Sequence, residues 1–174
     1  MPRLLLLRHA EAEIPPGTAD ADRPLSLRGH RDAEAMGRLV AARDWRPDLI
    51  LCSPSRRTRE TLVEVQKSLD GGTAVHFLPE LYNGAENEYR AAIRRSGAEA
   101  ACLLLIGHNP TIHQTALHLS ASGSPGLIEQ LRQSFPPAAF ATIEVDGAWD
   151  AINSDAGRLV DLVTPEEAFR QLAL

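Results

Sequence analysis

The sequence contains very little cysteine, with only Cys52 and Cys102 among its 174 residues. Cys102 lies inside an apolar run and Cys52 closes another, so a framework of disulfide bonds is not expected. A reducing cytoplasm is therefore the simpler compartment to predict, with both thiols buried. Long hydrophobic runs are missing as well. The run from Leu4 to Leu7 is too short for the core of a signal peptide, and no other stretch is long enough to span a bilayer.

An excess of positive charge is also missing. The chain has 18 Lys and Arg against 23 Asp and Glu, a net charge of -5, which opposes nonspecific attraction to nucleic acid or to an anionic membrane. A local basic pocket remains compatible with this charge. The sequence has no internal repeat or low-complexity tract, and its length fits a single hydrophobic core. We therefore expect one domain over residues 1–174, with no nucleic acid or membrane partner.

What the sequence does contain is an alternation of apolar runs of strand length with segments of helical periodicity. Strands are predicted at residues 3–8, 48–52, 75–78, 100–106, 139–145 and 158–162, and helices at 28–43 after a Ser26 cap, 57–69, 86–95 and from Pro110 through Leu119 to the break that begins at Gly123. Residues 11–26, rich in proline and acids, are predicted to form a loop. This alternation predicts an α/β fold: a three-layer sandwich with a mostly parallel central sheet flanked by helices.

Three of the predicted strands end in polar groups that suit an anion. Arg8 and His9 follow the first strand, Ser53 to Arg57 follow the second, and Gly107 to Asn109 follow a later one. The carboxyl ends of parallel strands meet at one edge of a sheet, where open α/β sheets bind ligands, so these groups are expected to share one crevice. A guanidinium presents a fixed fork of donors to two oxygens, and Arg8 and Arg57 are therefore predicted to bind phosphate.

The two histidines are predicted to have different roles. A neutral imidazole attacks phosphorus when its other ring nitrogen is held by an acceptor, so His9 is the candidate nucleophile, oriented by a backbone carbonyl. His108 is expected to donate to the phosphoryl oxygens and to add positive charge in the transition state. Zinc is the rival interpretation, but the sequence has no His-x-x-x-His or Cys-x-x-Cys spacing. No metal and no organic cofactor are predicted.

The segments LRHAEAE, SPSRRTRET and GHNP, in this order, resemble the histidine phosphatase, or phosphoglycerate-mutase-like, superfamily. The resemblance implies that His9 is the nucleophile, that Arg8 and Arg57 are the phosphate arginines, and that His108 is the second histidine. The family's opening signature is commonly Arg-His-Gly. Ala10 replaces the glycine here, as in the small phosphohistidine phosphatase branch, and this difference favours that branch.

The same resemblance points to a glutamate in the middle of the chain as the acid that protonates a leaving oxygen. Glu80, in LPELYNGAENEY, is the best positional match, although a surface carboxylate explains it equally well. The need for such an acid depends on the substrate. An alkoxide is a poor leaving group, whereas phosphohistidine departs as neutral imidazole when its other ring nitrogen is protonated.

The predicted function is hydrolysis of a phosphoryl group through a phosphohistidine intermediate on His9. The short stretch between Arg57 and His108 leaves little room for a lid domain, so a phosphorylated signalling protein is the first substrate to expect. A phosphatase for small phosphorylated metabolites is the second alternative. A phosphoglycerate-mutase-type phosphotransferase or a noncatalytic phosphate-binding module comes third.

Overall fold

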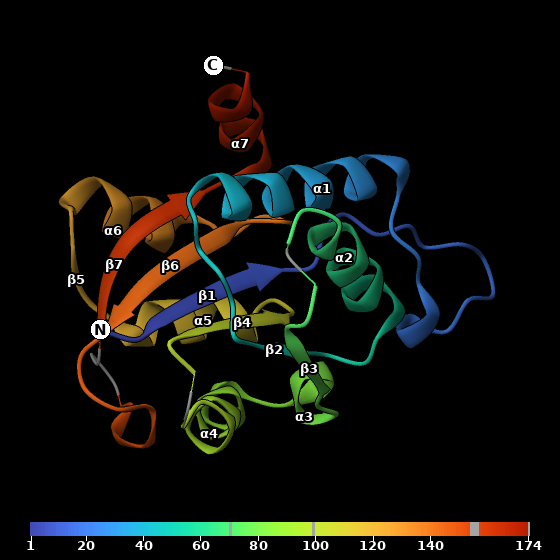
Figure 1. Cartoon of the computed structure of the whole chain (residues 1–174). Helices are drawn as coiled ribbons and strands as arrows, with labels where there is room; N and C mark the ends of the chain where they lie inside the picture. Colours follow the sequence, from blue (N-terminus) through green and yellow to red (C-terminus); the bar gives the residue numbers. More distant parts are fainter. Residues whose placement is uncertain (70, 99, 154–156, 174) are drawn as a thin grey trace.

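The computed structural model describes residues 1–69, 71–98, 100–153 and 157–173, and within these ranges seven strands form one sheet (Figure 1). The sheet order is β3-β2-β4-β1-β6-β7-β5. Only β6 runs antiparallel to its neighbours, β1 and β7, and the other pairs are parallel. The strands are β1 (Arg3–Arg8), β2 (Leu49–Cys52), β3 (Ala74–Phe77), β4 (Cys102–Gly107), β5 (Ser120–Gly123), β6 (Phe140–Val145) and β7 (Gly157–Val163).

Helices cover both faces of this sheet, as Figure 1 shows. One face packs on α1, α2 and α7, and the other on α4, α5 and α6. The mostly parallel three-layer sandwich predicted from the sequence is thus confirmed. The helices are α1 (Leu27–Ala42), α2 (Arg56–Gln66), α3 (Glu80–Asn83), α4 (Glu86–Ser96), α5 (Thr111–Leu119), α6 (Pro125–Gln133) and α7 (Pro165–Leu172), with short 3-10 turns at Asp20–Asp22 (η1) and Trp149–Ala151 (η2).

The leucine run of β1 lies at the centre of the molecule. Its four side chains, Leu4 to Leu7, are each 0% exposed because β1 lies between β4 and β6 and is covered by helices on both faces. Leu5 and Leu7 pack toward α1 and α2, whereas Leu4 and Leu6 pack toward α4 and α5. A continuous apolar run suits such a strand, since both faces of it are buried. This packing fixes the carboxyl end of β1, where His9 follows.

Both cysteines are free and buried. Burial raises the pKa of the Cys52 thiol and of the Cys102 thiol to about 12, so both stay protonated near neutral pH. The predicted pair of buried thiols is therefore confirmed. In the part of the chain that the structure describes, every helix is too short or too polar to cross a membrane.

Several elements differ from the sequence-based prediction. Helices α3, α6 and α7 were not predicted, and α2 ends at Gln66 rather than at residue 69. Helix α5 ends at Leu119, and β5 occupies residues 120–123, where the helix was expected to continue to the break at Gly123. Helix α7 does carry a sequence signal, because Thr164 and Glu167 form a capping box and proline occupies the first turn. Ser26 caps α1 as predicted, with its hydroxyl accepting from the Gly29 amide at 3.0 Å.

Tyr89, which is 1% exposed, connects α4 to α3 and to the segment that follows β4. Its hydroxyl donates to the Leu81 carbonyl at 2.6 Å and accepts from the backbone amide of His108 at 3.2 Å. Gly107 allows this close approach, since a Cβ at that position would lie 2.6 Å from the Tyr89 hydroxyl oxygen and 2.8 Å from the ring carbon Cε2. Because Gly107 has no side chain, the Tyr89 hydroxyl can reach the His108 amide and hold the start of that segment in place.

We predict that Gly107→Ala lowers the free energy of unfolding by about 1–3 kcal/mol, because the added methyl group overpacks the buried Tyr89 ring. The matched control is Gly126→Ala on α6, where a Cβ would meet nothing within 4 Å. That change is expected to leave stability equal or to raise it by up to about 1 kcal/mol. Urea unfolding of the three proteins measures the difference, and equal losses in both variants would contradict the packing argument.

Candidate active site

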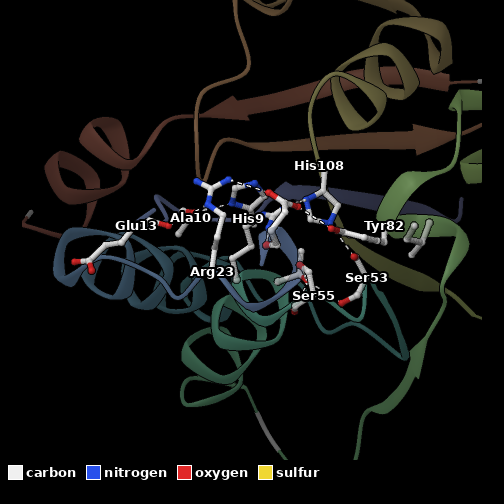
Figure 2. A network of polar contacts seen from close by, with 12 residues as sticks. His9, Ala10, Glu13, Arg23, Ser53, Ser55, Tyr82 and His108 are labelled. Atoms are coloured by element: carbon white, nitrogen blue, oxygen red, sulfur yellow. Dashed lines mark hydrogen bonds and ion pairs between the residues drawn. The ribbon is translucent and has the colours of Figure 1, made fainter. Parts of the chain in front are cut away.

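The ends of β1, β2 and β4 bring three predicted segments together (Figure 2). The His9 amide donates to the Gly107 carbonyl at 3.0 Å, and the Ser53 amide donates to the Ile106 carbonyl at 3.1 Å. Because β4 lies between the other two strands, these bonds continue both parallel ladders to the edge of the sheet. The rings of His9 and His108 consequently lie with their centroids 5.2 Å apart.

The His9 ring is oriented by a backbone carbonyl. Its Nδ1 lies 2.7 Å from the carbonyl oxygen of Ala10, and since a carbonyl only accepts, Nδ1 carries the hydrogen. Nε2 therefore keeps its lone pair in the neutral ring. The Ala10 peptide is itself fixed, because its amide donates to the buried Thr61 hydroxyl at 3.1 Å, which in turn donates to the Arg57 carbonyl at 2.7 Å.

His9 is held in its neutral form. Burial is the largest cause, and the positive charges of Arg57, Arg8 and Arg23 act in the same direction, so the pKa of His9 falls to about 4. The hydrogen bond to Ala10 opposes this shift without cancelling it. Near neutral pH the ring is thus uncharged, with Nδ1 protonated and Nε2 available as a nucleophile.

His108 is also neutral. It is 7% exposed, and burial lowers its pKa to about 3, with repulsion from His9, when that ring is protonated, and from Arg57 acting in the same direction. Arg57 donates from Nη2 to Nδ1 at 3.3 Å, so the ring hydrogen lies on Nε2, which is 2.7 Å from the Ser53 hydroxyl oxygen. Burial and the neighbouring guanidinium thus disfavour the imidazolium here, and the positive charge expected from His108 in the transition state stays a prediction.

The positive charge of the site comes from arginines. Arg57, the second residue of α2, is 6% exposed and lies against His108. Arg8 donates from Nη1 to the Phe135 carbonyl at 3.0 Å, and its charge acts on both histidines. Among the described residues, the buried Nε groups of Arg8 and Arg57 have no acceptor. An oxyanion that accepted from these groups would relieve an unsatisfied donor, which costs about 1–3 kcal/mol when buried.

Glu80 is engaged elsewhere. Its carboxylate accepts from Arg95 Nη2 at 2.5 Å, at the surface between α3 and α4. Within the described ranges, no hydrogen bond joins Glu80 to His9, Arg57 or His108. Its role as the general acid stays a prediction.

Sequence reasoning missed three residues of the polar network. Asp20, in η1, accepts from both terminal nitrogens of Arg57: its carbonyl oxygen lies 2.7 Å from Nη1 and its Oδ2 lies 3.1 Å from Nη2. Tyr82 donates to Asp20 Oδ2 at 2.7 Å, and its ring stands edge-on to His108. Arg23 donates from Nη1 to Asp20 Oδ1 at 3.3 Å. The loop at residues 11–26 carries Asp20 and Arg23, and its only sequence signal was its content of proline and acids, whereas Tyr82 lies outside this loop.

The chain is similar to known proteins over most of its length. The model of the histidine phosphatase superfamily (branch 1) matches residues 4–89. An uncharacterized protein of Mycobacterium tuberculosis (strain CDC 1551 / Oshkosh) is 33% identical over 161 residues, which cover 91% of this chain and 99% of that protein. Phosphohistidine phosphatase SixA of Escherichia coli (strain K12) is 25% identical over 148 residues, covering 83% of this chain and 86% of that protein. A solved structure from Nakamurella multipartitia, provisionally assigned as phosphohistidine phosphatase SixA, matches with a TM-score of 0.84 and 31% identity and covers 94% of this chain and 96% of its own.

The two buried histidines predict a specific dependence of stability on pH. Their pKa values of about 4 and about 3 lie below the ordinary 6.5, so the unfolded chain binds protons that the folded chain does not. Stability should therefore fall as the pH drops below 6.5, down to about pH 4 for His9 and about pH 3 for His108.

We predict that His108→Gln loses less stability than the unmodified protein between about pH 7 and about pH 5, measured by urea unfolding. His76→Gln, an exposed position on β3, should keep the original slope, and identical slopes for all three proteins would contradict the argument.

Proposed function

The chain belongs to the histidine phosphatase superfamily, and on this premise we propose that it hydrolyses phosphoryl groups through a phosphohistidine formed on His9. The observation that carries the proposal is the state of the His9 ring. Its Nδ1 is held by the Ala10 carbonyl, and its pKa of about 4 leaves Nε2 unprotonated near neutral pH. The guanidiniums of Arg8 and Arg57, whose Nε donors have no acceptor among the described residues, are near enough for their charges to lower its pKa.

In the proposed first step, His9 Nε2 attacks phosphorus while the bond from phosphorus to the leaving group breaks. The ring becomes positively charged, and the Ala10 carbonyl stabilises this charge through its hydrogen bond with Nδ1. Arg8 and Arg57 donate to the phosphoryl oxygens, the role that metal ions have in other phosphoryl transfer enzymes. His108, whose Nδ1 accepts from Arg57, keeps that guanidinium in place and is proposed to turn its Nε2 hydrogen toward the phosphoryl group.

In the second step, water attacks the phosphorus of the phosphohistidine. The P–N bond breaks, inorganic phosphate leaves, and His9 recovers its neutral ring. We propose that neither step uses a metal ion or an organic cofactor, because the arginines supply the positive charge. We also propose a cytoplasmic location, supported by the two free buried thiols.

For the substrate we propose a phosphohistidine on a protein. The carboxylate that contacts the site, Asp20, is a poor proton donor, because the hydrogen bond from Tyr82 and the charge of Arg57 lower its pKa to about 2. Glu80 is bound to Arg95. A substrate whose leaving group departs as imidazole needs no protonation of an alkoxide, so it suits this set of groups. The relatives described as phosphohistidine phosphatases support the same substrate class.

A small phosphate ester is the second candidate. It is favoured by the position of Glu80 on α3, the same four-residue helix that carries Tyr82 into the network. If the Glu80 side chain left Arg95 and, in its protonated form, donated to the leaving oxygen, it would supply the acid that an ester requires.

We predict that His9→Ala lowers the rate of phosphate release by roughly a thousandfold or more, as removal of a nucleophile does in other enzymes. Acid-labile phosphate should be trapped on the unmodified protein during turnover and be absent from the variant. His76→Ala, at an exposed position, is the matched control and should keep the full rate. Assays contain EDTA, and a need for added metal would contradict the metal-free reaction. A full rate in His9→Ala would overturn the proposed intermediate.

A second experiment identifies the substrate class. On a phosphohistidine protein, Glu80→Gln is expected to change the rate less than about threefold, whereas turnover of alkyl phosphate esters should be slow in both proteins. Glu129→Gln, an exposed acid on α6, controls for the change of charge. A preference for esters, together with a large loss of ester turnover only in Glu80→Gln, would replace the first candidate by the second.

A further inference from the structure

The carboxylate of Asp20 lies between two guanidiniums. Its Oδ1 is 3.3 Å from Arg23 Nη1 and its Oδ2 is 3.1 Å from Arg57 Nη2. Asp20 belongs to η1, in the loop that leads from β1 to α1, so it reaches Arg57 from a different element than α2. The Asp20 carboxylate thus bridges the guanidiniums of Arg23 and Arg57 at the candidate active site.

Arg23 is directed toward this site. Its Nε donates to the Glu13 carbonyl at 3.0 Å, and its side chain is only 22% exposed. Figure 2 shows the Arg23 side chain beside His9, and its charge is among those that lower the pKa of His9. A third guanidinium therefore acts on the proposed nucleophile together with Arg8 and Arg57.

The position of the Asp20 carboxylate also shows how far apart the Arg23 and Arg57 guanidiniums lie. Carboxylate and phosphoryl oxygens accept from guanidinium forks in the same way, so two arginines that one carboxylate bridges are spaced for one phosphoryl group to bridge. Asp20 uses both terminal nitrogens of Arg57, one through its carbonyl and one through its carboxylate. These donors are attached to the same guanidinium whose Nε has no acceptor among the described residues.

We propose that Arg23 is a substrate-binding residue of the phosphoryl site, and that the Asp20 carboxylate is a tethered anion which the substrate displaces from Arg23 and Arg57. This inference rests on the proposed function, because it assigns the residues that hold the phosphoryl group there. In it, Asp20 keeps the two cations paired and oriented until a dianion replaces its single charge.

The exposure of Asp20 fits displacement rather than permanent pairing. Its side chain is 56% exposed, while that of Arg57 is 7% exposed. Ion pairs with one partner in water are weak, since solvent screens them, so a dianion that reaches the more buried guanidinium competes well. Tyr82, which donates to the same carboxylate oxygen, provides a partner that Asp20 can keep when Arg57 turns to the substrate.

The test measures binding of inorganic phosphate by calorimetry to the full chain. Asp20→Asn removes the competing charge and should tighten phosphate binding about threefold to tenfold, and Arg23→Ala should weaken it about tenfold, the effect of one charge-assisted hydrogen bond. Asp22→Asn, on the same turn, controls for net charge, and Arg28→Ala, an exposed arginine of α1, controls for loss of a cation. Both controls should stay within about twofold of the unmodified protein.

In the double variant, Arg23→Ala should reduce the gain that Asp20→Asn gives, because one of the two freed cations is gone. Weaker phosphate binding in Asp20→Asn than in Asp22→Asn would overturn the tethered anion and make Asp20 a residue that positions Arg57. Unchanged binding in Arg23→Ala would overturn its assignment to the site. Failure of the proposed function is separate: it would appear as no phosphate release by the unmodified protein, whatever the binding results.

Discussion

The contacts of Arg57 hold the candidate active site together. Its guanidinium donates to the His108 ring and to Asp20, and its backbone carbonyl accepts from Thr61. Thr61 accepts from the Ala10 amide, and the Ala10 carbonyl fixes the His9 ring. A single residue at the start of α2 is therefore connected to both imidazoles, through its side chain on one side and its main chain on the other. The positions of the two rings depend on where α2 begins.

The charge of this buried guanidinium contributes to the charge states around it. A buried cation needs acceptors, and the Asp20 carbonyl and carboxylate provide them. Burial of the two rings, with the charge of this cation acting in the same direction, lowers the pKa of His9 to about 4 and that of His108 to about 3. The histidines stay neutral mainly because they are buried, and the positive charge of the site is carried by the arginines. A neutral His9 is the state that a nucleophilic imidazole requires, so the arginines that suit an anion also favour the state that the proposed nucleophile needs.

The sequence was sufficient to predict the parts of the fold and site that depend on buried strands. Continuous apolar runs at residues 3–8 and 100–106 marked strands buried on both faces, and polar groups at their ends marked the edge of the sheet where His9 and His108 meet. Asp20, Arg23 and Tyr82 were missed because loops and single turns have no periodicity, and their contacts follow from tertiary packing. The low pKa of His108 has no sequence signal for a similar reason, since it depends on burial and on a guanidinium 51 residues away in sequence.

These two groups of residues divide the work of the site. The sheet ends carry His9, Ser53 and His108, whose positions are fixed by fully buried strands. The loop from β1 to α1 and the turn at α3 carry Asp20, Arg23 and Tyr82, which are more exposed and which no strand restrains. A loop that supplies an anion and a cation to the same clamp can change substrate preference without moving the nucleophile. In the proposed mechanism, attack at phosphorus depends on the sheet, while the choice between a nitrogen and an oxygen leaving group is expected to depend on which carboxylate the loops bring to it.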